Sequence, residues 1–184
     1  MAEIITREWA MPNKNTFSIK PIEKFIHRYI NLYAGDSAIT VDPFARDKKI
    51  ATYTNDLNPN TQADYHMDAV EFMEMLVNKG IKADCVLFDP PYSPRQITEC
   101  YSAAGLTATM KDTQNGAFYK RCRDVIRKLC KKDSFVLSFG WNSTGMGKSF
   151  HRHEIMLVCH GGAHNDTICL ADRMIEEQKD MFDG

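Results

Sequence analysis

The chain has 184 residues, of which 43% are hydrophobic and 26% are charged, and its formal net charge is -1 at pH 7. This length and composition are typical of one globular domain, and no apolar run of about 18 residues predicts a membrane span. The near-neutral charge argues against a strongly basic nucleic-acid binder, so any polyanion must be bound by local basic patches. The charged N-terminus MAEIITREWAMPNKN has no signal-peptide core, so we expect a cytoplasmic protein.

The first half of the chain predicts one helix followed by short strands. Apolar residues recur at helical spacing in PIEKFIHRYINLY (21–33), and Pro21 stands in the first turn of that helix. Strand-like runs follow at 38–44, 51–57 and, more weakly, 63–68.

The second half alternates helices with strongly apolar strands. A helix over 69–80 ends at a glycine, and the nearly continuous apolar run ADCVLFD (83–89) is typical of a strand buried on both faces of a parallel sheet. A basic amphipathic helix over 116–132 comes next. This alternation predicts an α/β protein with a doubly wound, mostly parallel sheet. The remaining strands are predicted at 134–140, 153–162 and 166–173, the last two as an antiparallel pair.

Four acidic residues stand at the ends of successive predicted strands. In doubly wound sheets, ligands bind beyond the carboxyl ends of the strands. The sequence therefore predicts that Asp42, Asp56, Asp68 and Asp89 line one rim of the sheet. Each of them also suits a turn or a helix cap, so a purely structural role stays open.

The segment ADCVLFDPPYSPRQ (83–96) ends its strand abruptly and continues with two prolines. Pro90 and Pro91 restrict the backbone, so a stiff loop presents Asp89, the Pro90 carbonyl and Tyr92. A carboxylate beside a carbonyl offers two acceptors to a planar amino group, and Tyr92 offers a flat face to a base. Two acceptors that pull on the amine protons favour a tetrahedral nitrogen able to attack a methyl sulfonium. The pattern indicates methyl transfer to an exocyclic amine of a flipped-out base.

The DPPY stretch resembles the catalytic motif of the amino-methyltransferases, which methylate adenine N6 or cytosine N4 with S-adenosylmethionine. The order of motifs resembles the compact adenine-specific DNA methylases of phages and prophages. The resemblance implies a seven-stranded, Rossmann-like methyltransferase fold, S-adenosylmethionine as cofactor and DNA as partner. It also implies that residues 1–184 form a single methyltransferase domain, in which the catalytic residues are Asp89, Pro90, Pro91 and Tyr92.

Further segments resemble the cofactor-binding parts of the same family. TFSIKPIEKFI resembles the Lys-Pro helix segment that touches the methionine part, and AITVDPFARD resembles the cofactor loop DPFxGxG. TNDLNP and HMDA resemble the strand ends whose acids bond the ribose and the adenine amino group. A solvated lysine at a helix start remains the alternative for Lys20. The matches imply that the cofactor is bound by Phe17, Lys20, Asp42, Pro43, Phe44, Ala45, Asp56, Leu57, Asp68, Ala69 and Asp89.

The chain departs from the family pattern in two places. Ala45, Arg46 and Asp47 stand where the family has glycines, which permit tight turning and close approach of the cofactor, so cofactor affinity is the property we expect to differ. No target-recognition domain is inserted, which leaves the segments near 93–117 and 141–153 to read a base sequence and favours a homodimer or a short target. The predicted substrate contacts are Tyr92, Ser93, Arg95, Gln96, Trp141 and Asn142.

Several features carry negative or ambiguous signals. The six cysteines form no C-x-x-C pair, so reduced and buried thiols are expected. His160 and His164 with Cys159 and Cys169 match no usual zinc spacing, and no metal is expected. The absence of a Pro-Cys dipeptide argues against C5-cytosine methylation. The basic residues of the helix over 116–132 suit either a solvated face or a phosphate track.

The residues leave three functions open. Adenine-N6 methylation of DNA comes first, and the same pair of acceptors also fits cytosine N4 or an amino group in RNA. The third is a cofactor-poor relative that binds nucleic acid without catalysis, which the missing glycines and the near-neutral charge favour.

Overall fold

The structure is a computed structural model that describes residues 4–32, 37–91, 94–105, 115–162 and 164–175. None of the helices in these ranges is both long and apolar enough to cross a membrane. The elements in chain order are β1 (Ile4–Trp9), the 3-10 helix η1 (Thr16–Ser18), α1 (Lys20–Leu32), β2 (Thr40–Asp42), β3 (Tyr53–Thr54), α2 (Ala69–Asn78), β4 (Ala83–Phe88), α3 (Pro94–Ala103), α5 (Asn115–Leu129), β5 (Cys130–Gly140), β6 (Phe150–Cys159) and β7 (Thr167–Met174).

A seven-stranded sheet runs through the molecule in the order β1-β6-β7-β5-β4-β2-β3. Strand β7 is antiparallel to both of its neighbours, and all other neighbouring strands are parallel. The predicted doubly wound, mostly parallel sheet and the predicted antiparallel C-terminal pair are therefore confirmed. The carboxyl ends of six strands and the beginning of β7 lie at one edge of the sheet.

Strand β4 shows why its sequence is apolar throughout. All six of its residues are buried, because helices cover both faces of the sheet at this point. Cys85 and Leu87 belong to the core under α1, whereas Val86 and Phe88 belong to the core under α2 and α5. Helix α1 buries the apolar stripe that its spacing predicts, with Ile22 and Ile26 fully inaccessible. The cysteines are free, and all except the half-buried Cys100 are buried, as predicted.

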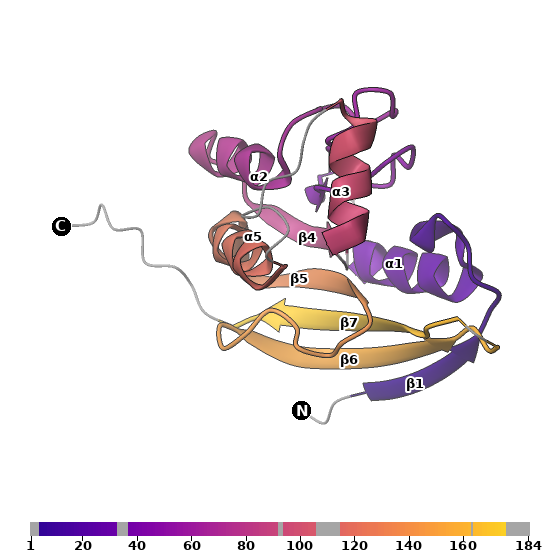
Figure 1. Ribbon diagram of the computed structural model, residues 1–184. Helices are drawn as coiled ribbons and strands as arrows, with labels where there is room; N and C mark the ends of the chain where they lie inside the picture. The colour runs from indigo at the N-terminus through magenta and orange to yellow at the C-terminus, as the bar shows by residue number, and fades with distance from the viewer. Residues whose placement is uncertain (1–3, 33–36, 92–93, 106–114, 163, 176–184) are drawn as a thin grey trace.

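The structure corrects the predicted set of strands. Residues 63–68 form no strand and contribute one isolated bridge, between Asn55 and Tyr65. The seventh strand is β1 instead, which pairs with β6 at the outer edge of the sheet (Figure 1). The sequence gives little local sign of β1, because Ile5 remains 72% exposed and the strand is defined by pairing with residues about 150 positions later.

Two helices also differ from the predictions. Helix α3 was not predicted; it begins shortly after Asp89, in a region predicted to be free for reading a base sequence. The basic helix α5 ends at Leu129, three residues earlier than predicted, because Cys130 already pairs with Ala83 of β4. A backbone irregularity follows, with Asp133 at a positive φ of 70°, before β5 settles into register.

Candidate active site

A cavity of about 440 Å³ opens at the edge of the sheet where the parallel strands end. Segments that follow β1, β2, β3, β4, β5 and β6 contribute to its wall, together with the first residue of β7. This is where a doubly wound sheet binds its ligands. Of the predicted site residues, those in this wall are Phe44, Asp56, Asp89, Pro90, Pro91 and Trp141.

Asp89 lies directly after β4 and remains partly accessible from this cavity. Burial raises the pKa of its carboxyl group to about 6, although a hydrogen bond with the Thr16 side chain and the nearby charge of Arg46 act in the opposite direction. A carboxylate with this pKa is ionised at neutral pH and holds a proton more readily than an ordinary aspartate. Asp89 can therefore accept a hydrogen bond from an amine and also take up its proton.

The two prolines place backbone acceptors beside Asp89. Pro90 and Pro91 both line the cavity, and the Tyr119 hydroxyl lies 3.4 Å from the Pro91 carbonyl oxygen, to which it donates. Among the described residues, none donates a hydrogen bond to the Pro90 carbonyl. The predicted pair of acceptors, the Asp89 carboxylate and the Pro90 carbonyl, thus borders one cavity. Tyr92 and Ser93 lie outside the described residues, so the stacking role of Tyr92 stays a prediction.

Asp42 ends β2 and is fully buried. The backbone N–H of Phe44 donates to its Oδ1 atom at 3.0 Å, whereas Oδ2 has no partner among the described residues. Burial, together with the negative charges of Asp89 and Asp56, raises the pKa of Asp42 well above its ordinary value. A buried carboxyl oxygen without a donor is costly, so a nearby cationic or hydrogen-bonding group would stabilise it. Asp42, like Ala45, was predicted to contact the cofactor but lines neither this cavity nor the smaller one described below.

The loop after β2 takes the conformation that the family's glycine would favour, but it does so with an arginine. Arg46 occupies the position of the first glycine in DPFxGxG and has a positive φ of 51°. Its backbone N–H donates to Asp56 at 3.1 Å, and its guanidinium donates to the Lys14 carbonyl at 2.8 Å. These contacts hold a left-handed residue that costs about 1–2 kcal/mol for a side chain with a Cβ atom. Ala45 is buried, with its N–H bonded to the Asn55 carbonyl.

Asp56 and Asp68 both have the structural roles that the sequence left open. Asp56 accepts hydrogen bonds from the backbone of Arg46 and Asn58, and Asp68 caps α2 through the N–H groups of Val70 and Glu71. Both residues also line a second, smaller cavity of about 60 Å³. Its other predicted members are Pro43, Phe44, Leu57, Ala69 and Pro91. Asp56 and Asp68 therefore line the candidate site and also have structural roles.

Four predicted contacts are placed elsewhere. Phe17 is 4% exposed and packs edge-to-face on Phe139, so its side chain belongs to the core under α1. Lys20 lines a different groove, on the far side of the segment 10–13. Arg95 is exposed and pairs with Glu99 along α3, and Asn142 lines a small hollow near Gly145. The side chain of Gln96 lies outside the described residues.

Several residues of the main cavity were not predicted. Thr16, Cys100, His160 and Thr167 line its wall. The His160 Nδ1 atom lies 2.8 Å from the Ala10 carbonyl and must donate to it, which leaves Nε2 of a neutral ring to accept from the Thr167 hydroxyl at 2.9 Å. Extending the strand-end rule to β6 and β7 would have found this pair. Nothing local in the sequence marks Thr16 or Cys100.

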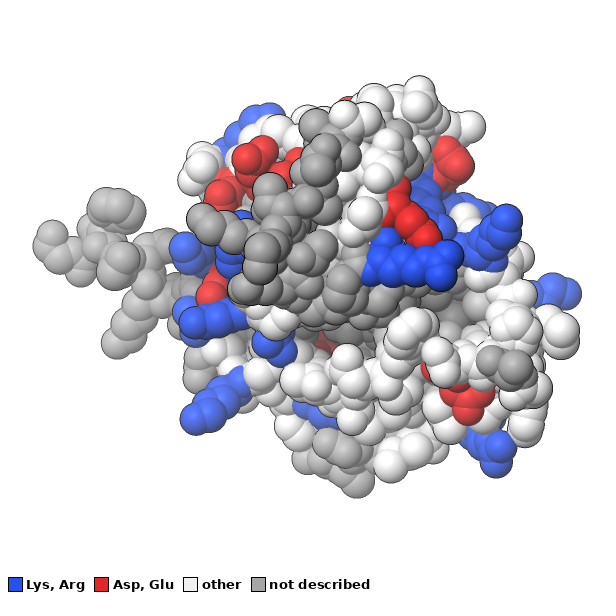
Figure 2. Space-filling view, viewed as in Figure 1, with Lys and Arg blue, Asp and Glu red and all other residues white. Residues whose placement is uncertain are grey.

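Positive charge does not gather into one patch on the face of the molecule shown in Figure 2. On the face shown in Figure 2, Lys and Arg side chains occupy several separate places, with Asp and Glu among them. On α5, Lys120, Arg121, Arg127 and Lys128 are exposed, and none of these side chains lines the main cavity. The described residues contain no group of three or more His, Cys, Asp or Glu side chains that would hold a metal ion.

Comparisons with known proteins identify the fold. No protein-family model matches the chain, and no curated protein matches it. The crystal structure of SMU.776, "a putative methyltransferase complexed with SAH", matches with a TM-score of 0.57 and 10% identity over 82% of this chain and 48% of that chain. The fold is that of the S-adenosylmethionine-dependent methyltransferases. The chain spans about half the length of SMU.776, and at this identity the likeness concerns the fold alone.

A second solved structure is similar at a lower level. The SAM-dependent methyltransferase from Agrobacterium tumefaciens has a TM-score of 0.49 and 11% identity, over 84% of this chain and 63% of that chain.

Proposed function

We propose that the chain is an S-adenosylmethionine-dependent methyltransferase that methylates the N6 amino group of adenine in DNA. The observation that carries the proposal is that Asp89 and Pro90, which form the two-acceptor motif, line one cavity with Phe44 and Asp56 from the ends of neighbouring strands. A methyl donor and an amine acceptor must meet in one space, and this cavity of about 440 Å³ is lined by residues suited to each.

The residues present fit the cofactor. The Asp89 carboxylate, in the wall of the main cavity, suits the cationic amino group of its methionine part. Asp42 lies behind this wall, fully buried, and its Oδ2 atom has no partner among the described residues, so its charge would support the same cation. Asp56 faces the main cavity beside a backbone turn and suits the ribose hydroxyls, and Asp68, at the smaller cavity, suits the amino group of the base. When bound, S-adenosylmethionine would supply an electrophilic methyl group, and its sulfonium sulfur would keep the electron pair of the broken methyl–sulfur bond as a neutral thioether.

The protein's own residues then act on the substrate amine. The ionised Asp89 carboxylate and the Pro90 carbonyl accept its two N–H groups, which localises the nitrogen lone pair. As the nitrogen–carbon bond forms, the amine loses one proton, and Asp89, with its pKa near 6, takes that proton and passes it to solvent. Tyr92 is expected to stack on the flipped base.

The test combines product analysis with one matched pair of variants. DNA treated with the protein and S-adenosylmethionine is digested to nucleosides and weighed, and we expect N6-methyladenine. Asp89→Ala should abolish it, whereas Asp124→Ala, which removes an exposed aspartate on α5, should not. N4-methylcytosine, or product from RNA alone, would assign the substrate differently while keeping the chemistry. Undiminished methylation by Asp89→Ala would overturn the mechanism.

One observation favours the binding-only alternative. Arg46 stands at the glycine position of the cofactor loop and holds it in a left-handed conformation with its side chain attached to the Lys14 carbonyl. Calorimetry with S-adenosylmethionine decides between the two readings, because a binding-only relative releases no heat even at a large excess of cofactor.

A further inference from the structure

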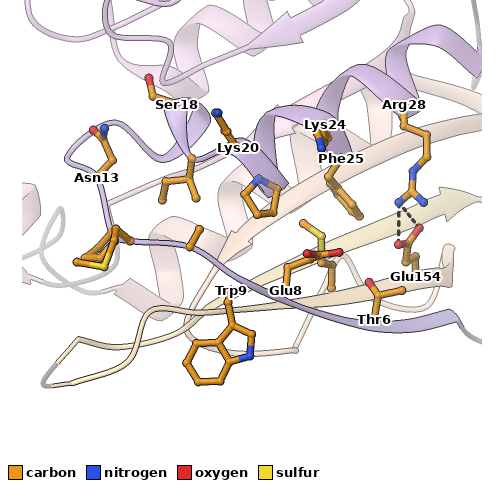
Figure 3. Close-up of a pocket in the computed structure, with 16 residues that line it drawn as sticks. Thr6, Glu8, Trp9, Asn13, Ser18, Lys20, Lys24, Phe25, Arg28 and Glu154 are labelled. Atoms are coloured by element: carbon orange, nitrogen blue, oxygen red, sulfur yellow. Dashed lines mark hydrogen bonds and ion pairs between the residues drawn. The ribbon is translucent and has the colours of Figure 1, made fainter.

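A groove of about 680 Å³ lies between α1 and the N-terminal strand β1, apart from the two cavities described above (Figure 3). Lys20 and Lys24 stand along its α1 side, and Thr6 and Glu8 of β1 stand across from them, while the indole ring of Trp9 is turned away. The wall is therefore mixed, with charged side chains on both sides and apolar residues between them.

The two lysines differ from the arginine that follows them on the same helix. Lys20, Lys24 and Arg28 are four residues apart, so they lie on one face of α1 at intervals of about 6 Å. Arg28 is engaged, because it donates to both carboxylate oxygens of Glu154 at 2.7 Å. No carboxylate of the described residues pairs with Lys20 or Lys24, and both are exposed. The groove thus contains two cations that are available to an anion.

The groove adjoins the main cavity across the segment 10–13. Pro12, Asn13 and Ile19 line both of them. Ser18 and Asn13 add a hydroxyl and an amide at the same end of the groove as Lys20. A chain-like ligand with one group in the main cavity can therefore continue past Asn13 toward Lys20 and Lys24.

We propose that this groove holds the phosphodiester backbone of the nucleic-acid strand whose target base enters the main cavity, with Lys20 and Lys24 as the phosphate contacts. The inference rests on the proposed function, and in it Lys20 binds the substrate and not the cofactor. Unpaired lysines in a groove that leads to the base site match the repeating charge of a strand backbone. Glu8, across the groove, repels phosphate and should weaken binding.

The experiment measures binding of a short, fluorescein-labelled single-stranded oligodeoxynucleotide with one adenine, by anisotropy over a series of salt concentrations. The paired substitution Lys20→Gln with Lys24→Gln should weaken binding roughly tenfold and lower the slope of log affinity against log salt by about 0.7 for each lysine. Substituting both lysines with arginine should keep the slope. Glu8→Gln should tighten binding, the opposite of the lysine substitutions, because it removes a negative charge that faces the phosphates.

The matched control is a pair of exposed lysines on α5, Lys120→Gln with Lys128→Gln, which should leave the slope near that of the unsubstituted protein. An unchanged slope in the Lys20–Lys24 pair, or an equal loss in the α5 pair, would overturn the proposal. If the protein methylates DNA but the Lys20–Lys24 pair leaves the salt slope unaltered, the groove has no role in binding and the proposed function stands. If the two lysines are needed for binding but the protein neither methylates DNA nor releases heat with S-adenosylmethionine, the proposed enzyme activity is wrong and the groove's role stands.

Discussion

Buried acids lie in two parts of this molecule and are satisfied to different degrees. In the β6–β7 region, Asp172 pairs with Arg152 and accepts the Met146 N–H at 2.9 Å, and Glu154 accepts from Arg28 and from the Tyr29 hydroxyl at 2.6 Å. At the carboxyl edge, Asp42 is equally buried but has one backbone donor and one oxygen without a partner.

The difference lies in how many donors and positive charges surround each buried carboxyl group. An ionised carboxylate is stable inside a protein only when donors or positive charges surround it. Asp172 and Glu154 have those partners within the chain. Asp89 has the Thr16 side chain and the charge of Arg46, yet burial still raises its pKa, as it does for the neighbouring Asp42. A carboxyl group with a raised pKa in the wall of a cavity, such as Asp89, is typical of functional sites.

The largest expected effect is on stability, in the β6–β7 region. Arg152→Met leaves Asp172 buried without its cation, which should lower the free energy of unfolding by about 3–5 kcal/mol. Urea denaturation measures the change. The control is Arg95→Met, because Arg95 forms an exposed pair with Glu99 on α3 and its loss should change stability far less. Equal losses of stability in the two variants would contradict the view that the buried pair stabilises the fold more than the exposed pair does.

At the carboxyl edge, substitution should separate activity from stability. Asp89→Asn keeps the shape of the side chain but removes the charge and the proton acceptor, so the rate of methylation should fall by about 10²–10³-fold. The same variant should fold at least as well as the unsubstituted protein near pH 7, since it no longer buries an ionised group. Single-turnover assays and thermal unfolding measure the two effects. A parallel loss of both would assign Asp89 a structural role.

The stability and the activity of the protein should both depend on the ionisation of Asp89, in opposite directions as pH rises. Burial raises the pKa of Asp89 to about 6 in the folded protein, from an ordinary value of 3.8. The folded state then binds more protons than the unfolded state between these values, so its stability falls as pH rises from about 4 to about 6. The decrease is at most about 3 kcal/mol and should vanish in Asp89→Asn. Activity should rise over the same range, because only the ionised form accepts the amine.

Sequence patterns predicted the ends of the central strands well and the outer strand β1 poorly. Strands β2 and β4 are buried, and short apolar runs mark them in the sequence, so the positions of Asp42 and Asp89 follow from local residues. The predicted strand over 63–68, which would have ended at Asp68, did not form. Strand β1 depends on pairing with β6, and its exposed residues carry no comparable pattern. Helix α3 was not predicted, although the sequence has local signals for it: Pro94 stands in its first turn, and Arg95 comes four residues before Glu99.

The site residues divide in the same way. Asp56 and Pro90 were predicted because they belong to short motifs, whereas Thr16 and His160 reach the cavity from elements far apart in sequence. Lys20 follows a family motif but lies beyond the segment 10–13, in the other groove. A motif predicts which backbone reaches the rim, and the packing of neighbouring segments decides which cavity a side chain enters.

A smaller effect is expected at the unpartnered acid. Asp42→Asn keeps an acceptor for the Phe44 N–H but cannot become negatively charged, so S-adenosylmethionine should bind about tenfold to a hundredfold more weakly. In the unsubstituted protein, burial raises the pKa of Asp42, so binding of a cation should release a proton and become tighter as pH rises. Calorimetry at two pH values measures both. Equal affinities in the two proteins would remove Asp42 from the cofactor site.

The smallest expected effect tests the backbone of the cofactor loop. Because Arg46 has a φ of 51°, Arg46→Gly should be more stable than Arg46→Ala by about 1 kcal/mol, since both variants lose the contact with the Lys14 carbonyl and only alanine keeps the left-handed strain. Thermal unfolding of the two variants measures the difference. Equal stabilities would mean that the loop relaxes out of the left-handed region. Tighter cofactor binding by the glycine variant alone would show that the arginine weakens the cofactor site through the backbone, and not through its charge beside Asp89.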